Sequence, residues 1–204
     1  MKMHDPDTLQ FYDTTAETYA RRENAKPAKQ LDGFLARLAP GADVLELGCG
    51  SGHDAEAMIA KGFAVTPTDG SQELAQQAGK RLGRSVQVLK FGDLEAQDQY
   101  DGVWAKACLL HVPREALGEV VRRVHTALRG GGVFYSSFKH GGGHAKRDKF
   151  GRYYNNPSRE WLEEVYGTLP WASLSIETSS GRGFDDEPAE FLHVTAIKAG
   201  DQAG

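Results

Sequence analysis

Three glycines at every second position follow an apolar run in the stretch VLELGCGSG, residues 44–52. Glycine is favoured where the backbone needs a positive φ or where another group must come close to it. A strand-to-helix turn without a ligand usually needs only one or two glycines. Gly48, Gly50 and Gly52 therefore predict a ligand near the backbone, where the N–H groups at the start of the following helix can donate to it.

The order of apolar runs and helical patterns predicts an α/β fold. Apolar runs expected to form strands fall at residues 42–47, 63–69, 85–91, 100–107 and 133–139. Stretches expected to form helices fall at residues 28–41, 54–62, 71–83, 113–132 and 158–166. Alternation of this kind predicts a parallel sheet with helices on both faces. Two last strands, at 172–180 and 189–199, follow each other without a helix, so we expect them to pair antiparallel.

Composition limits the classes of function. The 204 residues suit a single domain, residues 1–204. The net charge of −4 argues against a nucleic-acid partner, because such domains usually carry a basic surplus. Cys49 and Cys108 lack metal-ligand spacing, so we expect no metal site and a reduced, cytoplasmic setting. We also expect no signal peptide and no membrane partner, since no apolar run of the required length is present.

Other motifs narrow the identity of the ligand. A dinucleotide fingerprint would need a third glycine where His53 stands, and no P-loop sequence is present. Asp69 follows the second predicted strand at a distance from Gly48 that suits a carboxylate accepting both ribose hydroxyls of an adenosine. Asp93, in FGDL after the third strand, suits the adenine amino group or an ordinary Asp turn, and both interpretations stay open.

Taken in order, these motifs resemble the class I S-adenosylmethionine-dependent methyltransferases. The segments that match, between about Val44 and Phe138, are VLELGCGSG for the methionine-binding loop, TDGS for the ribose, FGDL for the adenine, YDGVWAKACLLHVP after strand four and LRGGGVFYSSF before strand five. The resemblance implies a Rossmann-like, doubly wound, seven-stranded, mostly parallel sheet with an antiparallel last strand. It implies S-adenosylmethionine as the cofactor and S-adenosylhomocysteine as the product. The chain also resembles a subset of small bacterial methyltransferases described as tellurite-resistance-related or uncharacterised, which implies no substrate.

The resemblance also implies which residues contact the cofactor. FYDTTAETYA, residues 11–20, is similar to the lead-in helix of the small bacterial members, so we expect residues 1–40 to cover the cofactor. The expected cofactor contacts are Tyr19, Glu46, Gly48, Cys49, Gly50, Gly52, Asp69, Gly70, Ser71, Gly92, Asp93, Leu94 and Ala107.

Two segments are expected to serve the methyl acceptor. His111, after the fourth strand, is a candidate general base, because histidine titrates near neutral pH; a capping or packing role is the alternative. Residues 139–157 form a long, glycine-containing connection, which predicts a substrate-side lid. Arg152 and Tyr153 are its candidates for holding the acceptor by charge, hydrogen bonding or stacking. The alternative is a solvated loop whose tyrosines pack into the core.

The leading functional hypothesis is in-line methyl transfer to a small, anionic or aromatic metabolite. An RNA or protein methyltransferase of the same fold is the first alternative, since residues 139–152 are locally basic. A non-catalytic protein that binds the cofactor is the second. An NAD-dependent oxidoreductase is disfavoured by His53. The sequence is compatible with a monomer or a homodimer.

Overall fold

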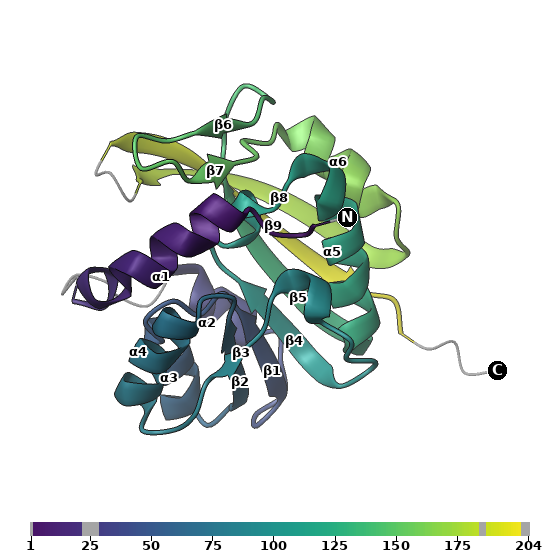
Figure 1. Ribbon diagram of the computed structural model, residues 1–204. Helices are drawn as coiled ribbons and strands as arrows, with labels where there is room; N and C mark the ends of the chain where they lie inside the picture. The colour runs from purple at the N-terminus through teal and green to yellow at the C-terminus, as the bar shows by residue number, and fades with distance from the viewer. Residues whose placement is uncertain (1, 22–28, 184–186, 201–204) are drawn as a thin grey trace.

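Seven strands form one sheet in the order β3-β2-β1-β4-β5-β9-β8 in this computed structural model (Figure 1). The structure describes residues 2–21, 29–183 and 187–200. The strands of this sheet are β1 (Asp43–Leu47), β2 (Ala64–Asp69), β3 (Gln87–Val88), β4 (Tyr100–Ala105), β5 (Leu128–Lys139), β8 (Trp171–Arg182) and β9 (Pro188–Lys198). A separate antiparallel pair consists of β6 (Lys146–Arg147) and β7 (Tyr153–Tyr154).

An α-helix follows each of the first two strands and precedes the fifth, and one more α-helix follows the segment that contains β6 and β7. The α-helices are α1 (Pro6–Ala20), α2 (Lys29–Leu35), α3 (His53–Ala60), α4 (Gln72–Leu82), α5 (Arg114–Ala127) and α6 (Arg159–Gly167). Two single-turn 3₁₀ helices, η1 (Phe91–Asp93) and η2 (Leu109–His111), follow the third and fourth strands.

The pairing of the strands confirms the predicted fold class. β1 pairs in parallel with β2 and with β4, and β4 pairs in parallel with β5. Strands β2 and β3 thus lie on one side of β1, and β4 lies on the other. Ligands of open α/β sheets bind in the crevice at the point where the strand order reverses in this way. β9 is antiparallel to both β5 and β8. The last strand therefore lies inside the sheet, and β8 forms its edge.

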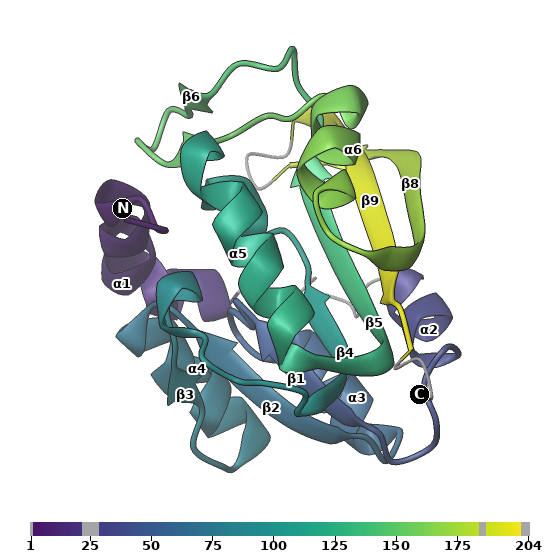
Figure 2. The same ribbon diagram turned by 90° about the vertical axis from the view of Figure 1, so that its right-hand side faces the viewer.

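Helices α5 and α6 cover one face of the sheet, while α2 and α3 cover the other (Figure 2). Alternation along β5 supplies both cores, because successive side chains of a strand point to opposite faces. Phe134 and Phe138 pack under α5 and α6. Tyr135 packs under α2 and α3, where its ring stacks on Trp104 with the centroids 4.0 Å apart.

Three predicted elements differ in extent from the observed ones. The strand predicted at 85–91 shrinks to β3, because it lies at the sheet edge, where Val88 is 48% exposed and pairs only with β2. The helix predicted at 113–132 ends at Ala127, and the glycines expected to close it lie within β5. The helix predicted at 28–41 is described as α2 and ends at Leu35.

Helix α1 begins earlier than the resemblance implies. Oδ1 of Asp5 accepts a hydrogen bond from the backbone N–H of Thr8 at 2.9 Å, and Pro6 occupies the first helical position. Both are standard signals for a helix start. The added turn brings Thr8, together with the following aromatic residues, over the carboxyl ends of the strands.

The three glycines after β1 all have a positive φ, and each is approached by another part of the protein. A Cβ on Gly48 would lie 2.5 Å from the Cβ of Cys108. A Cβ on Gly50 would lie 3.3 Å from the ring of Tyr19, and one on Gly52 would lie 3.3 Å from Ala78. The glycines are therefore required by the fold itself, as well as leaving the backbone of the loop accessible to a ligand.

We expect Gly48→Ala to lower the free energy of unfolding by about 3 kcal/mol, from a left-handed backbone penalty of roughly 1–2 kcal/mol and an overpacking cost of similar size. Gly131→Ala is the matched control, because Gly131 has a φ of +79° and nothing within 4 Å of an added Cβ. The control should lose only about 1 kcal/mol. Urea unfolding of the two variants measures both values, and equal losses would contradict a strict requirement for space beside Cys108.

Candidate active site

A cavity of about 840 Å³ lies at the carboxyl ends of β1, β2, β4 and β5. This volume is within the roughly 300–1,000 Å³ that small-ligand sites usually occupy. Helix α1 and the segment containing β6 and β7 contribute to the wall, with side chains such as Tyr12 and Tyr154. Within the described residues, no group of three metal-ligating side chains is present, and no helix is long and apolar enough to span a bilayer.

Asp69, at the tip of β2, organises one end of the cavity. One carboxylate oxygen accepts the N–H of Gly50 at 2.8 Å, and the other accepts the N–H of Ser71 at 2.9 Å. Burial raises the pKa of this carboxyl group to about 6, although the backbone donors oppose the shift. The backbone N–H of Gly70 also favours the ionised form of this carboxyl group. A carboxylate has roughly four acceptor sites, so the group keeps capacity for a further donor such as a ribose hydroxyl.

Glu46, within β1, is the second carboxyl group of this end, and it differs from Asp69 in its partners. Its side chain lines the cavity and is only 3% exposed. Among the described residues, its Oε2 atom has no hydrogen-bond partner. Burial raises the pKa of Glu46 well above its usual range, and the neighbouring Asp54 raises it further. Buried polar atoms are normally paired, so this oxygen points to a donor group supplied by a ligand.

The segment after β4 reaches the cavity through a strained backbone. Ala107 has a φ of +49°, which is uncommon for a residue with a side chain. Its N–H donates to Oγ of Ser137 in β5 at 2.9 Å, which fixes this conformation. The bond brings the carboxyl ends of β4 and β5 together beside the glycine loop.

Eight of the predicted cofactor contacts line the cavity together, namely Tyr19, Glu46, Gly48, Cys49, Gly50, Asp69, Gly70 and Ala107. Five others do not appear in its wall, namely Gly52, Ser71, Gly92, Asp93 and Leu94. Gly52 packs on α4, and Ser71 caps α4 with its hydroxyl oxygen 3.1 Å from the N–H of Leu74.

The adenine contact predicted for Asp93 is not brought to the cavity. The strand ends before this residue, and η1 leaves the Asp93 side chain exposed while Leu94 is buried in the core. Leu89, Lys90 and Phe91 line the wall there instead. The strand predicted at 85–91 ends at Val88 in the structure, so the residues at its carboxyl end are earlier in the chain than Asp93.

His111 lies in η2 at the other end of the cavity, with both ring nitrogens engaged. Nδ1 lies 2.6 Å from the carbonyl oxygen of Tyr153 and must donate to it. Nε2 therefore accepts, and its donor is the hydroxyl of Tyr12 at 2.9 Å. Burial lowers the pKa of His111 to about 4, so the imidazole is neutral at physiological pH.

Arg152 lines the cavity but is buried in its wall and paired with a carboxylate of the protein. It is 1% exposed, and Asp148 accepts from its Nε and Nη2 at 2.9 and 2.7 Å. Its Nη1 donates to the Tyr12 hydroxyl at 3.1 Å. The rings of Phe11 and Tyr154 lie 4.9 and 5.4 Å from the guanidinium carbon. Its positive charge is thus balanced within the protein, which differs from the expected contact with the acceptor.

Tyr153, the third catalytic candidate, has its side chain outside the cavity wall. The Tyr153 hydroxyl accepts from the backbone N–H of Arg114 at 3.3 Å. The backbone N–H of Tyr153 donates to the hydroxyl oxygen of Thr8 at 2.8 Å. The next residue, Tyr154, lines the cavity instead. Adjacent residues of the short strand β7 face opposite ways, and the sequence contains no signal that says which of the two tyrosines faces inward.

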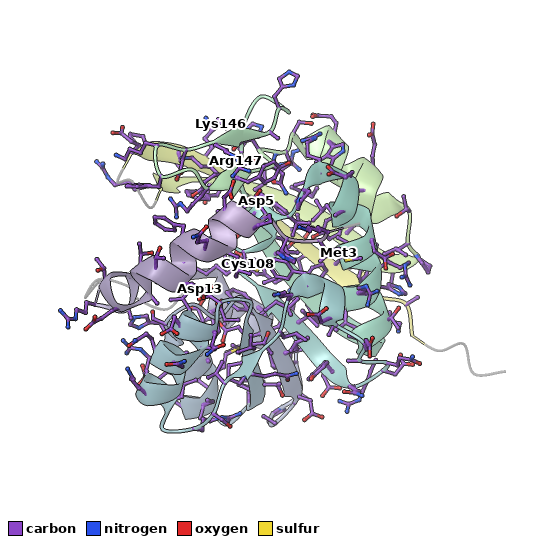
Figure 3. The ribbon with its side chains drawn as sticks, viewed as in Figure 1. Met3, Asp5, Asp13, Cys108, Lys146 and Arg147 are labelled. Carbon is purple, nitrogen blue, oxygen red and sulfur yellow. The ribbon has the colours of Figure 1, made fainter. Side chains whose placement is uncertain are left out.

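Ion pairs fasten the start of α1 to the lid segment (Figure 3). Arg147 donates to both carboxylate oxygens of Asp5, at 2.9 and 2.7 Å, and also lies 3.3 Å from Asp7. In the middle of α1, Oδ1 of Asp13 lies 2.5 Å from Oγ of Ser71 in the cap of α4. The helix is therefore fixed near its start to β6 and near its middle to the start of α4.

Sequence reasoning missed several residues of the cavity wall. Tyr135, Ser137 and Lys139 all line it from β5, and His193 lines it from β9. Nδ1 of His193 lies 2.8 Å from the Tyr135 hydroxyl, and its Nε2 lies 2.7 Å from Oγ of Ser179. The two-residue period of β5 could have grouped the first three, because Ser137 and Lys139 share a face with Tyr135.

Comparison with known proteins identifies the family. Residues 19–174 match the family described as "Methyltransferase domain". The ubiquinone biosynthesis O-methyltransferase of Xanthomonas campestris pv. campestris (strain B100) is 37% identical over 116 residues, which are 53% of this chain and 48% of that protein. An uncharacterized 37.1 kDa protein in transposon TN4556 of Streptomyces fradiae is 36% identical over 140 residues, covering 62% of this chain and 37% of that protein. The chain therefore spans about half the length, or less, of these curated relatives.

Solved structures share the fold. The Burkholderia thailandensis 1,6-didemethyltoxoflavin-N1-methyltransferase, crystallised with 1,6-didemethyltoxoflavin and S-adenosylhomocysteine, superposes with a TM-score of 0.74 at 22% identity, covering 95% of this chain and 88% of that one. A Haemonchus contortus phosphoethanolamine N-methyltransferase 2, crystallised with S-adenosyl-L-methionine, gives a TM-score of 0.73 at 16% identity, covering 95% and 59%. The chain therefore belongs to the methyltransferase-domain family, and it shares the fold of these methyltransferase structures.

Proposed function

We propose that this protein transfers a methyl group from S-adenosylmethionine to a small, anionic or aromatic acceptor. The observation that carries the proposal is one cavity of about 840 Å³ that joins the Asp69 end to the Tyr12–His111 pair. The curated relatives named as O-methyltransferases support an acceptor hydroxyl. The narrower relation to the tellurite-resistance-related subset stays a prediction, as does a cytoplasmic location.

The residues at the Asp69 end fit the cofactor. Glu46 offers its ammonium group a buried oxygen that has no partner among the described residues, and Asp69 offers its carboxylate to the ribose. Gly48 and Gly50 leave the loop backbone open on the cavity side. When bound, S-adenosylmethionine supplies a methyl group on a positively charged sulfur, which is the electrophile of the reaction.

At the other end, the Tyr12 hydroxyl is the group that meets the acceptor. Both nitrogens of His111 are engaged, so this histidine acts through Tyr12. Oη of Tyr12 donates to His111 and accepts from Arg152, which leaves one lone pair for an acceptor hydroxyl. As the acceptor oxygen is methylated, its proton passes to Oη, and the Tyr12 proton passes to Nε2 of His111. This is general-base assistance through a relay.

Helix α1 and residues 139–157 exclude water from the reacting groups in this proposal, as covering helix and lid. Their contacts through Asp5, Arg147 and Thr8 support a closed state in which small molecules are held. The same contacts weigh against an RNA acceptor, because the Arg147 charge in the basic stretch is already paired with acidic residues of α1.

The test of the function is transfer of labelled methyl groups from S-adenosylmethionine into a cell extract, followed by ultrafiltration. We expect the label in the small-molecule filtrate. Label that stays with macromolecules, and is released by ribonuclease or protease, would instead support the RNA or protein alternative. No transfer with retained cofactor binding would support a non-catalytic binder.

Removing the Asp69 carboxylate is expected to weaken cofactor binding. Asp69→Ala should reduce S-adenosylhomocysteine affinity by about 2–3 kcal/mol, because two charge-assisted hydrogen bonds are lost. Wild-type affinity should fall as the pH drops from 7.5 to 5, because the raised pKa of about 6 means that the carboxylate becomes protonated over this range. Titration calorimetry measures both effects. Glu73→Gln, on the exposed surface of α4, is the charge-matched control and should bind normally.

Removing the Tyr12 hydroxyl is expected to slow turnover without affecting cofactor binding. Tyr12→Phe and His111→Ala should each lower kcat by roughly 100-fold, the usual scale of general-base assistance. Tyr153→Phe should keep nearly full activity, since its hydroxyl lies outside the cavity wall. Steady-state kinetics on the acceptor found in the extract decides the assignment, and a larger loss in Tyr153→Phe than in Tyr12→Phe would refute it.

A further inference from the structure

Lys139 is a positive charge at the acceptor end of the cavity whose role the proposed function leaves open. It is the last residue of β5, its side chain is half-buried, and it lines the cavity. Its Nζ lies 6.0 Å from the centre of the Tyr154 ring. Within residues 2–21, 29–183 and 187–200, no carboxylate forms an ion pair with it.

Two other cations of the cavity wall, Lys106 and Arg152, are already paired with carboxylates of the protein. Lys106 lies 3.3 Å from the carboxylate of Asp54, which also accepts from the indole N–H of Trp104. Arg152 is held by Asp148. A half-buried ammonium group without an anion gains most from a ligand that brings one, because water competes less strongly there than at the surface.

The surroundings of Lys139 are aromatic. Tyr154 is near both Lys139 and His111, because its ring centre lies 6.0 Å from Nζ of Lys139 and 4.7 Å from the ring centre of His111. Phe191 lies opposite Lys139 in the β5–β9 register and also lines the cavity. An aromatic ligand that lies against Tyr154 is therefore close to both the Tyr12–His111 pair and the ammonium group.

We propose that Lys139 binds a carboxylate on the aromatic ring of the acceptor, whose ring hydroxyl meets Tyr12. This inference rests on the proposed function and specifies the acceptor class as a hydroxylated aromatic acid. A single ammonium group balances a single negative charge, so a carboxylate fits this position better than a doubly charged phosphate.

The experiment measures binding of simple probes to the protein saturated with S-adenosylhomocysteine. The probes are 2-, 3- and 4-hydroxybenzoate, phenol and phenyl phosphate, titrated into wild type, Lys139→Met and Lys146→Met. The Lys146 variant is the matched control, because Lys146 is exposed on β6 and lies outside the cavity wall. Lys139→Met keeps the length and apolar stem of the side chain and removes only the charge.

We expect at least one hydroxybenzoate to bind wild type ten times more tightly than phenol. Lys139→Met should lose this preference and leave the phenol affinity and the S-adenosylhomocysteine affinity unchanged, while Lys146→Met should behave as wild type. Added salt should weaken the preference in wild type, because it rests on charge.

Three results would overturn the inference. One is that no hydroxybenzoate binds better than phenol, another is that the preference survives in Lys139→Met, and the third is that phenyl phosphate binds more tightly than every hydroxybenzoate. Each would leave methyl transfer to another small acceptor intact. Failure of the proposed function is distinguishable, because it shows as label in macromolecules, or as no transfer, in the extract experiment.

Discussion

The buried guanidinium of Arg152 holds helix α1 and the segment containing β6 and β7 together. A charge removed from water in this way is tolerated only with close compensation. Asp148 of that segment supplies the negative charge, and α1 supplies the Tyr12 hydroxyl and the Phe11 ring. Separating α1 from the segment would leave the guanidinium without two of these partners. The burial of one charge therefore ties the position of Tyr12, whose hydroxyl also donates to His111, to the position of Asp148.

The two buried carboxyl groups at the Asp69 end of the cavity, Asp69 and Glu46, differ in their hydrogen-bond partners. Asp69 accepts from two backbone N–H groups, which shape the glycine loop whether or not a ligand is bound. Glu46 keeps an oxygen without a partner among the described residues, and its pKa is raised by burial and by Asp54. A bound ammonium group would favour the ionised form of Glu46, since a neighbouring positive charge lowers the pKa of a carboxyl group. Asp69 thus holds the glycine loop without a ligand, while Glu46 has an oxygen that a ligand could engage.

Local patterns placed part of one end of the cavity, because its residues lie at strand tips that the sequence marks. Gly48, Gly50 and Asp69 follow clear apolar runs, and all three line the cavity. Asp93 lies outside the cavity wall, because the edge strand β3 has only one neighbour and ends earlier than its own residues suggest. The cofactor contacts of these residues stay predictions. The acceptor end could not be predicted in detail, since the bond between Tyr12 and His111 joins residues 99 positions apart.

The division of the chain explains why family membership leaves the acceptor undetermined. The family match covers residues 19–174, which include the glycine loop, Asp69 and His111. It excludes Tyr12 and all of β9. His111 is thus within the shared domain, but the Tyr12 hydroxyl that it contacts is supplied by a helix turn that precedes the match. Phe191, opposite Lys139, comes from β9, which follows the match. In the proposed function, the shared domain therefore supplies the cofactor end of the cavity, and segments both inside and outside the match form the acceptor end.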